Sequence, residues 1–100
     1  MRRFIALFAV AFAVSVHAAE QRIVDTYKRA CTVCHQAGVA GAPKIGDEEH
    51  WQKLLDEKGM AAMVESVRNG LNAMPPRGMC FDCSDDDYKA LIQYMQNPEA

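Results

Sequence analysis

From Gln21 onward, the apolar positions of the chain recur at the three- and four-residue spacing that places them on one face of an α-helix. Four such stretches occur. Their apolar residues are Ile23, Val24, Tyr27 and Ala30, then Trp51, Leu54 and Leu55, then Met60, Met63, Val64 and Val67, and finally Tyr88, Leu91, Ile92 and Met95. Since no stretch alternates apolar and polar residues as a half-buried strand does, the pattern predicts an all-α fold of four to five short helices.

The ends of these helices are indicated by residues that cap or break helices. The first helix covers residues 21–30 and runs into Cys31. Ser84, followed three residues later by Asp87, resembles a capping box, and the acidic first turn suits the positive end of a helix. The remaining predicted boundaries are Asp47 and Gly59 for the second helix, Asn69 and Gly70 for the end of the third, and Asn97 and Pro98 for the end of the fourth.

Two segments between the helices cannot continue a helix. Residues 36–46 contain three glycines and one proline, and residues 71–83 contain two prolines, one glycine and two cysteines. Glycine and proline at this density favour irregular backbone. We therefore expect two loops, and the candidate functional residues lie in or beside them.

The segment from Met1 to Ala18 resembles a secretory signal peptide. Two arginines follow Met1, residues 4–14 are an uninterrupted apolar run of 11, and small or modest residues precede Ala18. An uncleaved membrane anchor is the alternative, but a spanning helix needs about 20 apolar residues. We expect cleavage after Ala18, with Ala19 as the nearby alternative, which leaves residues 19–100 as a single exported domain.

The net charge argues against nucleic-acid binding, and the small size suggests that the domain needs a disulfide or a cofactor. The whole chain carries 11 basic and 13 acidic residues, and removal of the two arginines in residues 1–18 changes its net charge from −2 to −4. An acidic protein of this kind lacks the basic patch that binds nucleic acid. A domain as short as residues 19–100, with ordinary hydrophobicity, often needs a disulfide or a cofactor to complete its core.

The main chemical signal is the sequence Cys-Thr-Val-Cys-His at residues 31–35, because C-x-x-C-H is the attachment signature of a c-type haem. Two thiols three positions apart lie on one side of a helical turn, where they can form thioethers with the two vinyl groups of one porphyrin. We expect Cys31 and Cys34 to bind one haem c covalently. The adjacent His35 is then the proximal ligand of its iron.

Two other readings of the cysteines are weaker. A thiol-disulfide oxidoreductase also uses C-x-x-C, but in a βαβ context that this chain does not predict. A zinc site with Cys80 and Cys83 as the second pair is disfavoured because the stretch between the pairs, residues 35–79, is far longer than the about 15–20 residues of a zinc ribbon. A redox-active role of Cys80 and Cys83 is a further alternative, but no histidine or basic residue adjoins this pair to lower a thiol pKa.

The second axial position of the iron is predicted to be filled by a methionine from residues 71–83. Met74 is followed by Pro75 and Pro76, which stiffen the backbone and can hold its sulfur in place. Met79 in the same loop is the rival ligand. The methionines on the helical stripes are expected to pack in the core, as methionine often does, and these are Met60, Met63 and Met95.

Several motifs together resemble the bacterial cytochrome c5 family of class I monohaem c-type cytochromes. They are, in chain order, Cys31 to His35, Gly41 to Gly46, Trp51, Asn72 to Gly78, Cys80 to Asp85, and Tyr94 with Met95. The resemblance covers nearly the whole of residues 19–100. It implies a cytochrome c-like fold around one covalently bound haem, with His35 and Met74 as axial ligands.

The resemblance also implies three supporting features of the site. A structural disulfide joins Cys80 and Cys83, and the carbonyl of Pro43 accepts a hydrogen bond from the other ring nitrogen of His35. Trp51 is expected near the haem propionates, with packing in the core as the alternative. His50 is expected to be a solvated side chain in the first turn of an acidic helix rather than an iron ligand.

These features predict a periplasmic one-electron carrier rather than an enzyme. Its partners would be redox proteins such as a membrane-bound quinol oxidoreductase and a terminal oxidase or reductase, met by transient docking of a monomer or weak dimer. The contact surface would be small and apolar, formed by Val39, Ala40, Ala42 and Pro75. The alternative is a haem enzyme or ligand sensor, such as a small peroxidase, with an open sixth iron position.

Overall fold

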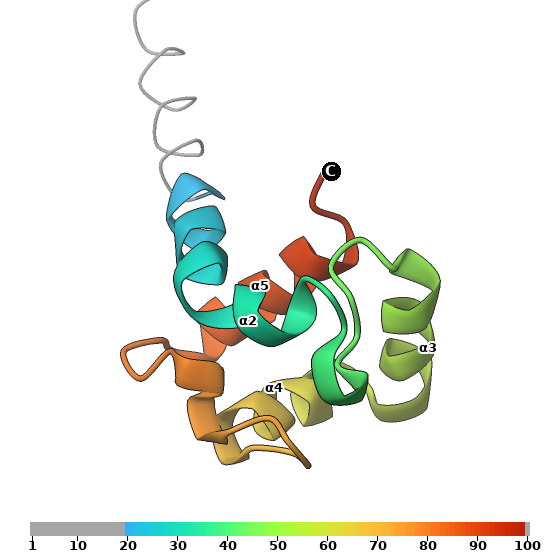
Figure 1. The fold of residues 1–100 in the computed structure, drawn as a ribbon. Helices are drawn as coiled ribbons and strands as arrows, with labels where there is room; N and C mark the ends of the chain where they lie inside the picture. Colours follow the sequence, from blue (N-terminus) through green and yellow to red (C-terminus); the bar gives the residue numbers. More distant parts are fainter. Residues whose placement is uncertain (1–19, 100) are drawn as a thin grey trace, which may run out of the picture.

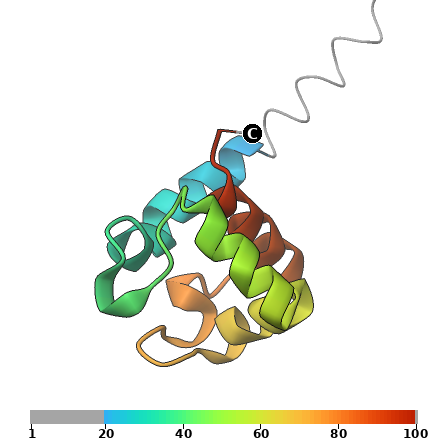
Figure 2. The ribbon, with the colours of Figure 1, turned by 90° about the vertical axis from the view of Figure 1, so that its right-hand side faces the viewer.

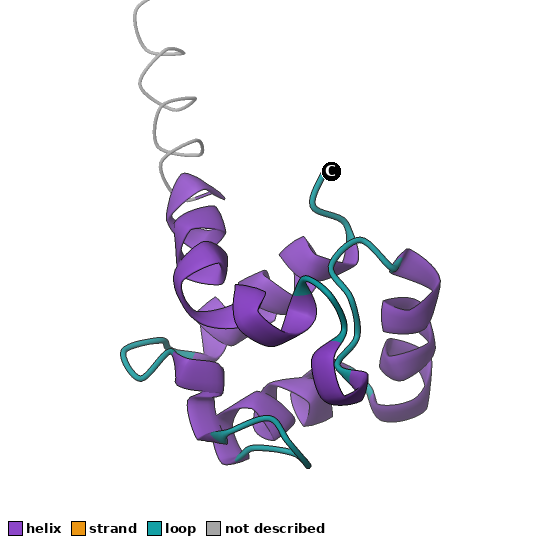
Figure 3. Cartoon of the chain, in the orientation of Figure 1, coloured by secondary structure: helices purple, strands orange, loops and turns teal. Residues whose placement is uncertain are grey.

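The computed structural model describes residues 20–99, which are helical apart from the connecting loops and contain no β-strand (Figures 1 and 3). The prediction of an all-α fold is confirmed. The helices are residues 20–26, α2 (Thr32–His35), α3 (Glu48–Lys58), α4 (Met60–Asn69) and α5 (Asp85–Gln96), and the shorter turns are η1 (Tyr27–Cys31), η2 (Val39–Gly41) and η3 (Pro76–Met79). The predicted signal peptide, residues 1–18, lies outside the described residues.

The first helix extends beyond its predicted end at residue 30. It widens into the π-helical turn η1 and continues through α2 to His35. Thr32 stabilises the wide turn, since its backbone N–H donates to the carbonyl of Tyr27 and its hydroxyl donates to the same oxygen at 3.0 Å. Both cysteines of the C-x-x-C-H sequence are therefore held on continuous helical backbone.

The predicted N-caps of α3 and α5 are confirmed. The carboxylate of Asp47 accepts from the backbone N–H of His50 at 3.3 Å. At α5, Ser84 Oγ accepts from the backbone N–H of Asp87 at 3.1 Å, and the Asp87 carboxylate accepts from the backbone N–H of Ser84 at 3.0 Å. This reciprocal pair satisfies two backbone donors and fixes where the last helix begins.

The core is built around α5, which contacts both α3 and α4. Its apolar stripe is almost completely buried, with Tyr88 only 1% exposed and Ile92 2% exposed. The first helix lies against the other side of α5, where the rings of Tyr27 and Tyr94 meet edge to face at 5.5 Å. The apolar periodicity of the sequence thus predicted the buried face of each helix.

The two loops lie on the same side of this helical frame. Figure 2 shows the segments around residues 36–42 and 71–76 projecting on one side, and both line a common cavity. The first loop is tied to the frame by backbone hydrogen bonds from Ile45 to His35 at 2.8 Å and from Gly46 to Met95 at 2.6 Å. Within residues 20–99, no helix has the length and apolarity needed to cross a membrane.

An ion pair ties the first helix to α5 and makes the stability of the fold depend on pH. Arg22 Nη2 lies 2.7 Å from Asp87 Oδ1, and this hydrogen bond, with the backbone N–H of Ser84, holds the pKa of Asp87 below its usual range. A carboxylate whose pKa is lowered by folding stabilises the native state above its unfolded pKa of about 4, and this contribution is lost as the pH falls through its folded pKa.

We expect Asp87→Asn to have a lower free energy of unfolding than the wild type at neutral pH. In acid, where Asp87 is protonated, the two proteins are expected to have similar free energies of unfolding. Urea titrations at several pH values measure these free energies. Asp86→Asn is the matched control, because it removes a carboxylate from the same helical turn that has no ion-pair partner within residues 20–99. A difference between wild type and Asp87→Asn that does not change with pH would contradict the prediction.

Candidate haem site

His35 is held in one orientation by a backbone carbonyl. The side chain is buried, with 6% exposed, and its Nδ1 lies 2.7 Å from the carbonyl oxygen of Pro43. Since a carbonyl can only accept, Nδ1 carries the proton in this hydrogen bond, and in the neutral imidazole Nε2 then has a free lone pair. His35 therefore presents a metal-ligating nitrogen to the cavity that it lines.

The loop that supplies this carbonyl is itself anchored by Trp51 from α3. The indole Nε1–H donates to the carbonyl of Lys44 at 2.8 Å, and the indole ring lies 5.7 Å from the imidazole of His35, centroid to centroid. Trp51 is only 3% exposed. Consecutive carbonyls of the loop thus accept from His35 and from Trp51, so packing of the tryptophan and orientation of the histidine are coupled.

Cys31 and Cys34 are partly buried thiols that are not bonded to each other. Both line a cavity of about 90 Å³ together with His35 and Met74. Burial raises the pKa of the Cys31 thiol from 9.0 to about 11, against a smaller opposing effect of Arg29. A reactive thiol has a lowered pKa, so the environment of Cys31 disfavours the oxidoreductase reading of the C-x-x-C sequence. The zinc reading is disfavoured because Cys80 and Cys83, its second pair, are bonded to each other.

An apolar cavity of about 220 Å³ lies between His35 and Met74, and two smaller ones of about 130 and 90 Å³ are also lined by both residues. The walls of the cavity of about 220 Å³ include Trp51, Leu54, Met63, Val67, Leu71, Ile92 and Met95. An imidazole, a thioether, two thiols and apolar walls are the donor set and the surroundings that a covalently bound haem requires. The residues present therefore fit haem c.

Met74 and Met79 occupy different environments in the second loop. Reciprocal backbone hydrogen bonds between Leu71 and Met74, at 2.9 and 3.0 Å, close a turn directly before Pro75. Met74 lines all three cavities named above, whereas Met79 is 57% exposed and lines only the smallest of them. This placement supports Met74 as the ligand. Met63 and Met95 are buried in the core, and they also border the cavity of about 220 Å³.

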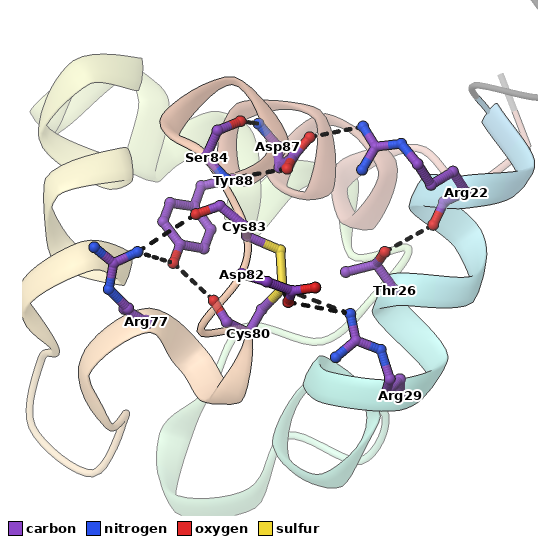
Figure 4. Close-up of a disulfide and its surroundings, with 10 residues drawn as sticks. All are labelled: Arg22, Thr26, Arg29, Arg77, Cys80, Asp82, Cys83, Ser84, Asp87 and Tyr88. Carbon is purple, nitrogen blue, oxygen red and sulfur yellow. Dashed lines mark hydrogen bonds and ion pairs between the residues drawn. A yellow bond between two sulfur atoms is a disulfide. The ribbon is translucent and has the colours of Figure 1, made fainter.

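Cys80 and Cys83 form a disulfide beside the start of α5 (Figure 4). Both residues are buried, and Cys80 is only 1% exposed. Arg29 of η1 lies 3.6 Å from Asp82 between them, so the disulfide loop also contacts the haem-attachment helix. Since both sulfurs are bonded to each other, the nearby carboxylate of Asp82 does not complete a metal site with them.

The pattern of apolar residues in the sequence does not predict two polar contacts of Tyr88 beside this disulfide. The Tyr88 hydroxyl donates to the carbonyl of Cys80 at 2.9 Å and accepts from Arg77 Nη1 at 3.3 Å (Figure 4). The only signal in the sequence is a tyrosine among buried apolar residues, because a buried hydroxyl needs a hydrogen-bond partner.

The side chain of His50 is 43% exposed, and its ring lies 3.9 Å from the Asp47 carboxylate.

Comparison with known proteins places this chain in a family. The family model described as cytochrome C oxidase, cbb3-type, subunit III, matches residues 18–95. Cytochrome c5 of Ectopseudomonas mendocina is 46% identical over 72 residues, covering 71% of this chain and 83% of the relative. Cytochrome c5 of Azotobacter vinelandii is 44% identical over 72 residues, covering 71% of this chain and 87% of the relative.

A solved structure shows the same similarity. A chain in the crystal structure of an electron transfer complex of nitrite reductase with cytochrome c aligns with a TM-score of 0.62 and 40% identity, covering 72% of this chain and 86% of that chain. The fold and the site define a class I monohaem c-type cytochrome. Within that class, the chain belongs to the cytochrome c5 family, whose members bind one haem c covalently and carry electrons.

The coupling through the first loop predicts the effect of Trp51→Phe. The variant keeps an aromatic ring but removes the N–H that donates to the Lys44 carbonyl, and we expect it to lower the free energy of unfolding by about 0.5–1.5 kcal/mol. Chemical denaturation of the haem-loaded protein measures this. Tyr94→Phe is the control, since the Tyr94 hydroxyl has no hydrogen-bond partner within residues 20–99. Equal stability of Trp51→Phe and wild type would contradict the coupling.

Proposed function

We propose that this protein is a periplasmic one-electron carrier between redox-protein partners of a respiratory chain. The observation that supports this most directly is that His35 and Met74 line the same apolar cavities, next to the thiols of Cys31 and Cys34. Two protein ligands to one iron leave no position for a substrate, which favours electron transfer over enzymatic chemistry.

Each residue of the proposed site has a defined task. Haem c, when bound, supplies an iron that gains and loses a single electron. Cys31 and Cys34 hold it covalently, His35 provides Nε2 as one ligand and Met74 provides its thioether sulfur as the other. Pro43 keeps the proton of His35 on Nδ1, so Nε2 remains available in both oxidation states. Fixed ligands on both sides limit the change in geometry on electron transfer.

The surface beside the site suits a partner that binds briefly. Exposed apolar side chains gather around the cavities that His35 and Met74 share, and they are Val33, Val39, Leu71 and Met79. The predicted contact residues Val39, Ala40, Ala42 and Pro75 also line these cavities. The similar solved chain comes from a complex of nitrite reductase with cytochrome c, which supports a redox protein as partner. A quinol oxidoreductase as donor and a terminal oxidase or reductase as acceptor fit this role.

The ligand assignment is tested by Met74→Leu, with Met79→Leu as the matched control in the same loop. We expect the oxidised wild-type protein to be low-spin with a methionine-to-iron charge-transfer band. Met74→Leu removes the sulfur and abolishes the band, whereas Met79→Leu keeps it. Loss of the band in Met79→Leu alone would assign the ligand to Met79. A high-spin wild type that binds cyanide in seconds would instead show an open iron position and contradict the carrier.

We further propose that residues 1–18 are a secretory signal removed during export to the periplasm. The charged start, the short apolar run and the small residues before Ala18 support this. The expected periplasmic product begins at Ala19 and carries one haem. Mass spectrometry of the purified protein measures both features. A product that retains Met1 to Ala18 in the membrane fraction would contradict the proposal.

A further inference from the structure

The turn that follows the prolines of the second loop has an unusual backbone. Three consecutive residues, Arg77, Gly78 and Met79, have positive φ values of 66°, 55° and 69°. This region of backbone space is strained for residues with a side chain, and such strain persists only where the surroundings hold it. The turn η3 therefore has this shape because other contacts impose it.

The consequence of this shape is a close approach between Gly78 and Met74. A Cβ atom at residue 78 would lie 2.9 Å from the Met74 methyl carbon Cε and 3.7 Å from Val67 Cγ1. A distance below 3.0 Å is shorter than a carbon–carbon contact, so the methyl group would have to move. Because this methyl group is the end of a flexible side chain, the movement costs little folding free energy. It nevertheless changes the sulfur, because the side chain either shifts Sδ or, by rotation about the Cγ–Sδ bond, turns its lone pairs.

The free space around Met74 determines the direction of that movement. Toward Cys80 and Tyr88, the void that Gly78 and Met74 share is only about 10 Å³, which is no larger than one water probe. The other cavity that they share, of about 90 Å³, is also lined by His35. On the other side lie the cavities of about 220 and 130 Å³ that Met74 shares with His35. A side chain at residue 78 would therefore push the Met74 methyl toward the space that the haem requires.

The turn is held against α5 by a small polar network. Arg77 Nη1 donates to the Tyr88 hydroxyl at 3.3 Å and to the carbonyl of Cys83 at 3.4 Å, while the Tyr88 hydroxyl donates to the carbonyl of Cys80 at 2.9 Å (Figure 4). Tyr88 is 1% exposed, so its bond to the Cys80 carbonyl is shielded from water, whereas the two bonds of Arg77 are partly buried. The network fixes residues 77–83 on a rigid helix.

We propose that Gly78 is a positioning residue that sets the place of the Met74 sulfur, and that Arg77 and Tyr88 anchor its turn to α5. The proposal rests on the proposed function, because it requires Met74 to be an iron ligand. Gly78 acts by the absence of a side chain: it lets the methyl group of Met74 lie against the turn, and the sulfur is then directed into the cavity.

The test measures how strongly the methionine holds the iron, by titrating the oxidised haem-loaded protein with imidazole, which competes for the same position. We expect Gly78→Ala to bind imidazole about tenfold more tightly than the wild type, with a weaker charge-transfer band. Gly59→Ala is the matched control, since Gly59, between α3 and α4, also has a positive φ of 84° but nothing lies within 4 Å of its Cβ position. Wild-type imidazole affinity in Gly78→Ala, or an equal change in Gly59→Ala, would overturn the proposal.

The anchor is tested separately by Tyr88→Phe, which keeps the buried ring and removes only the hydroxyl. Loss of its hydrogen bonds to Arg77 and Cys80 is expected to tighten imidazole binding by about threefold, whereas Tyr94→Phe is expected to leave it unchanged. Equal imidazole affinities of Tyr88→Phe and Tyr94→Phe would overturn the role of Tyr88. Met74→Leu distinguishes failure of the proposed function: if it keeps the charge-transfer band, Met74 is not the ligand, whatever the glycine variants show.

Discussion

The hydrogen bond from His35 to the carbonyl of Pro43 is the constraint on which the rest of the site depends. It fixes the ring and its tautomer, but it exists only if the loop of residues 36–46 folds back over α2. That fold in turn needs the backbone bond from Ile45 to the His35 carbonyl and the indole of Trp51 beneath the loop. A single ligand orientation thus depends on α2, α3 and the segment between them.

The thioether of Met74 in the second loop cannot be oriented in the same way, because it has no second polar atom that could form a hydrogen bond. Position must then come from packing and backbone shape. The turn between Leu71 and Met74 places the backbone, and Gly78 leaves room for the methyl group. The disulfide and Tyr88 then connect this turn to α5. Rigidity on the methionine side therefore comes from a longer chain of contacts than on the histidine side.

The sequence predicts the parts of this structure that depend on local pattern. Helical periodicity identified the buried faces, and the Ser84 cap followed from a residue type and a spacing. It did not predict the extension of the first helix to His35, because the π-helical turn depends on a Thr32 hydroxyl that bonds back to Tyr27. Nor did it indicate the contact of Arg77 with Tyr88, since these two residues, separated by 11 positions, meet only once the loop has folded.

The remaining question is why so small a chain can tolerate three consecutive residues with positive φ beside its functional site. The strained turn lies between a disulfide and the most buried helix, so the strain is opposed by contacts that also form the core. A loop with relaxed backbone could adopt several shapes and would hold the sulfur in several places. Since Tyr88 belongs both to the core stripe of α5 and to the network around Arg77, the core that keeps the fold together also holds the turn that contacts Met74, the proposed ligand.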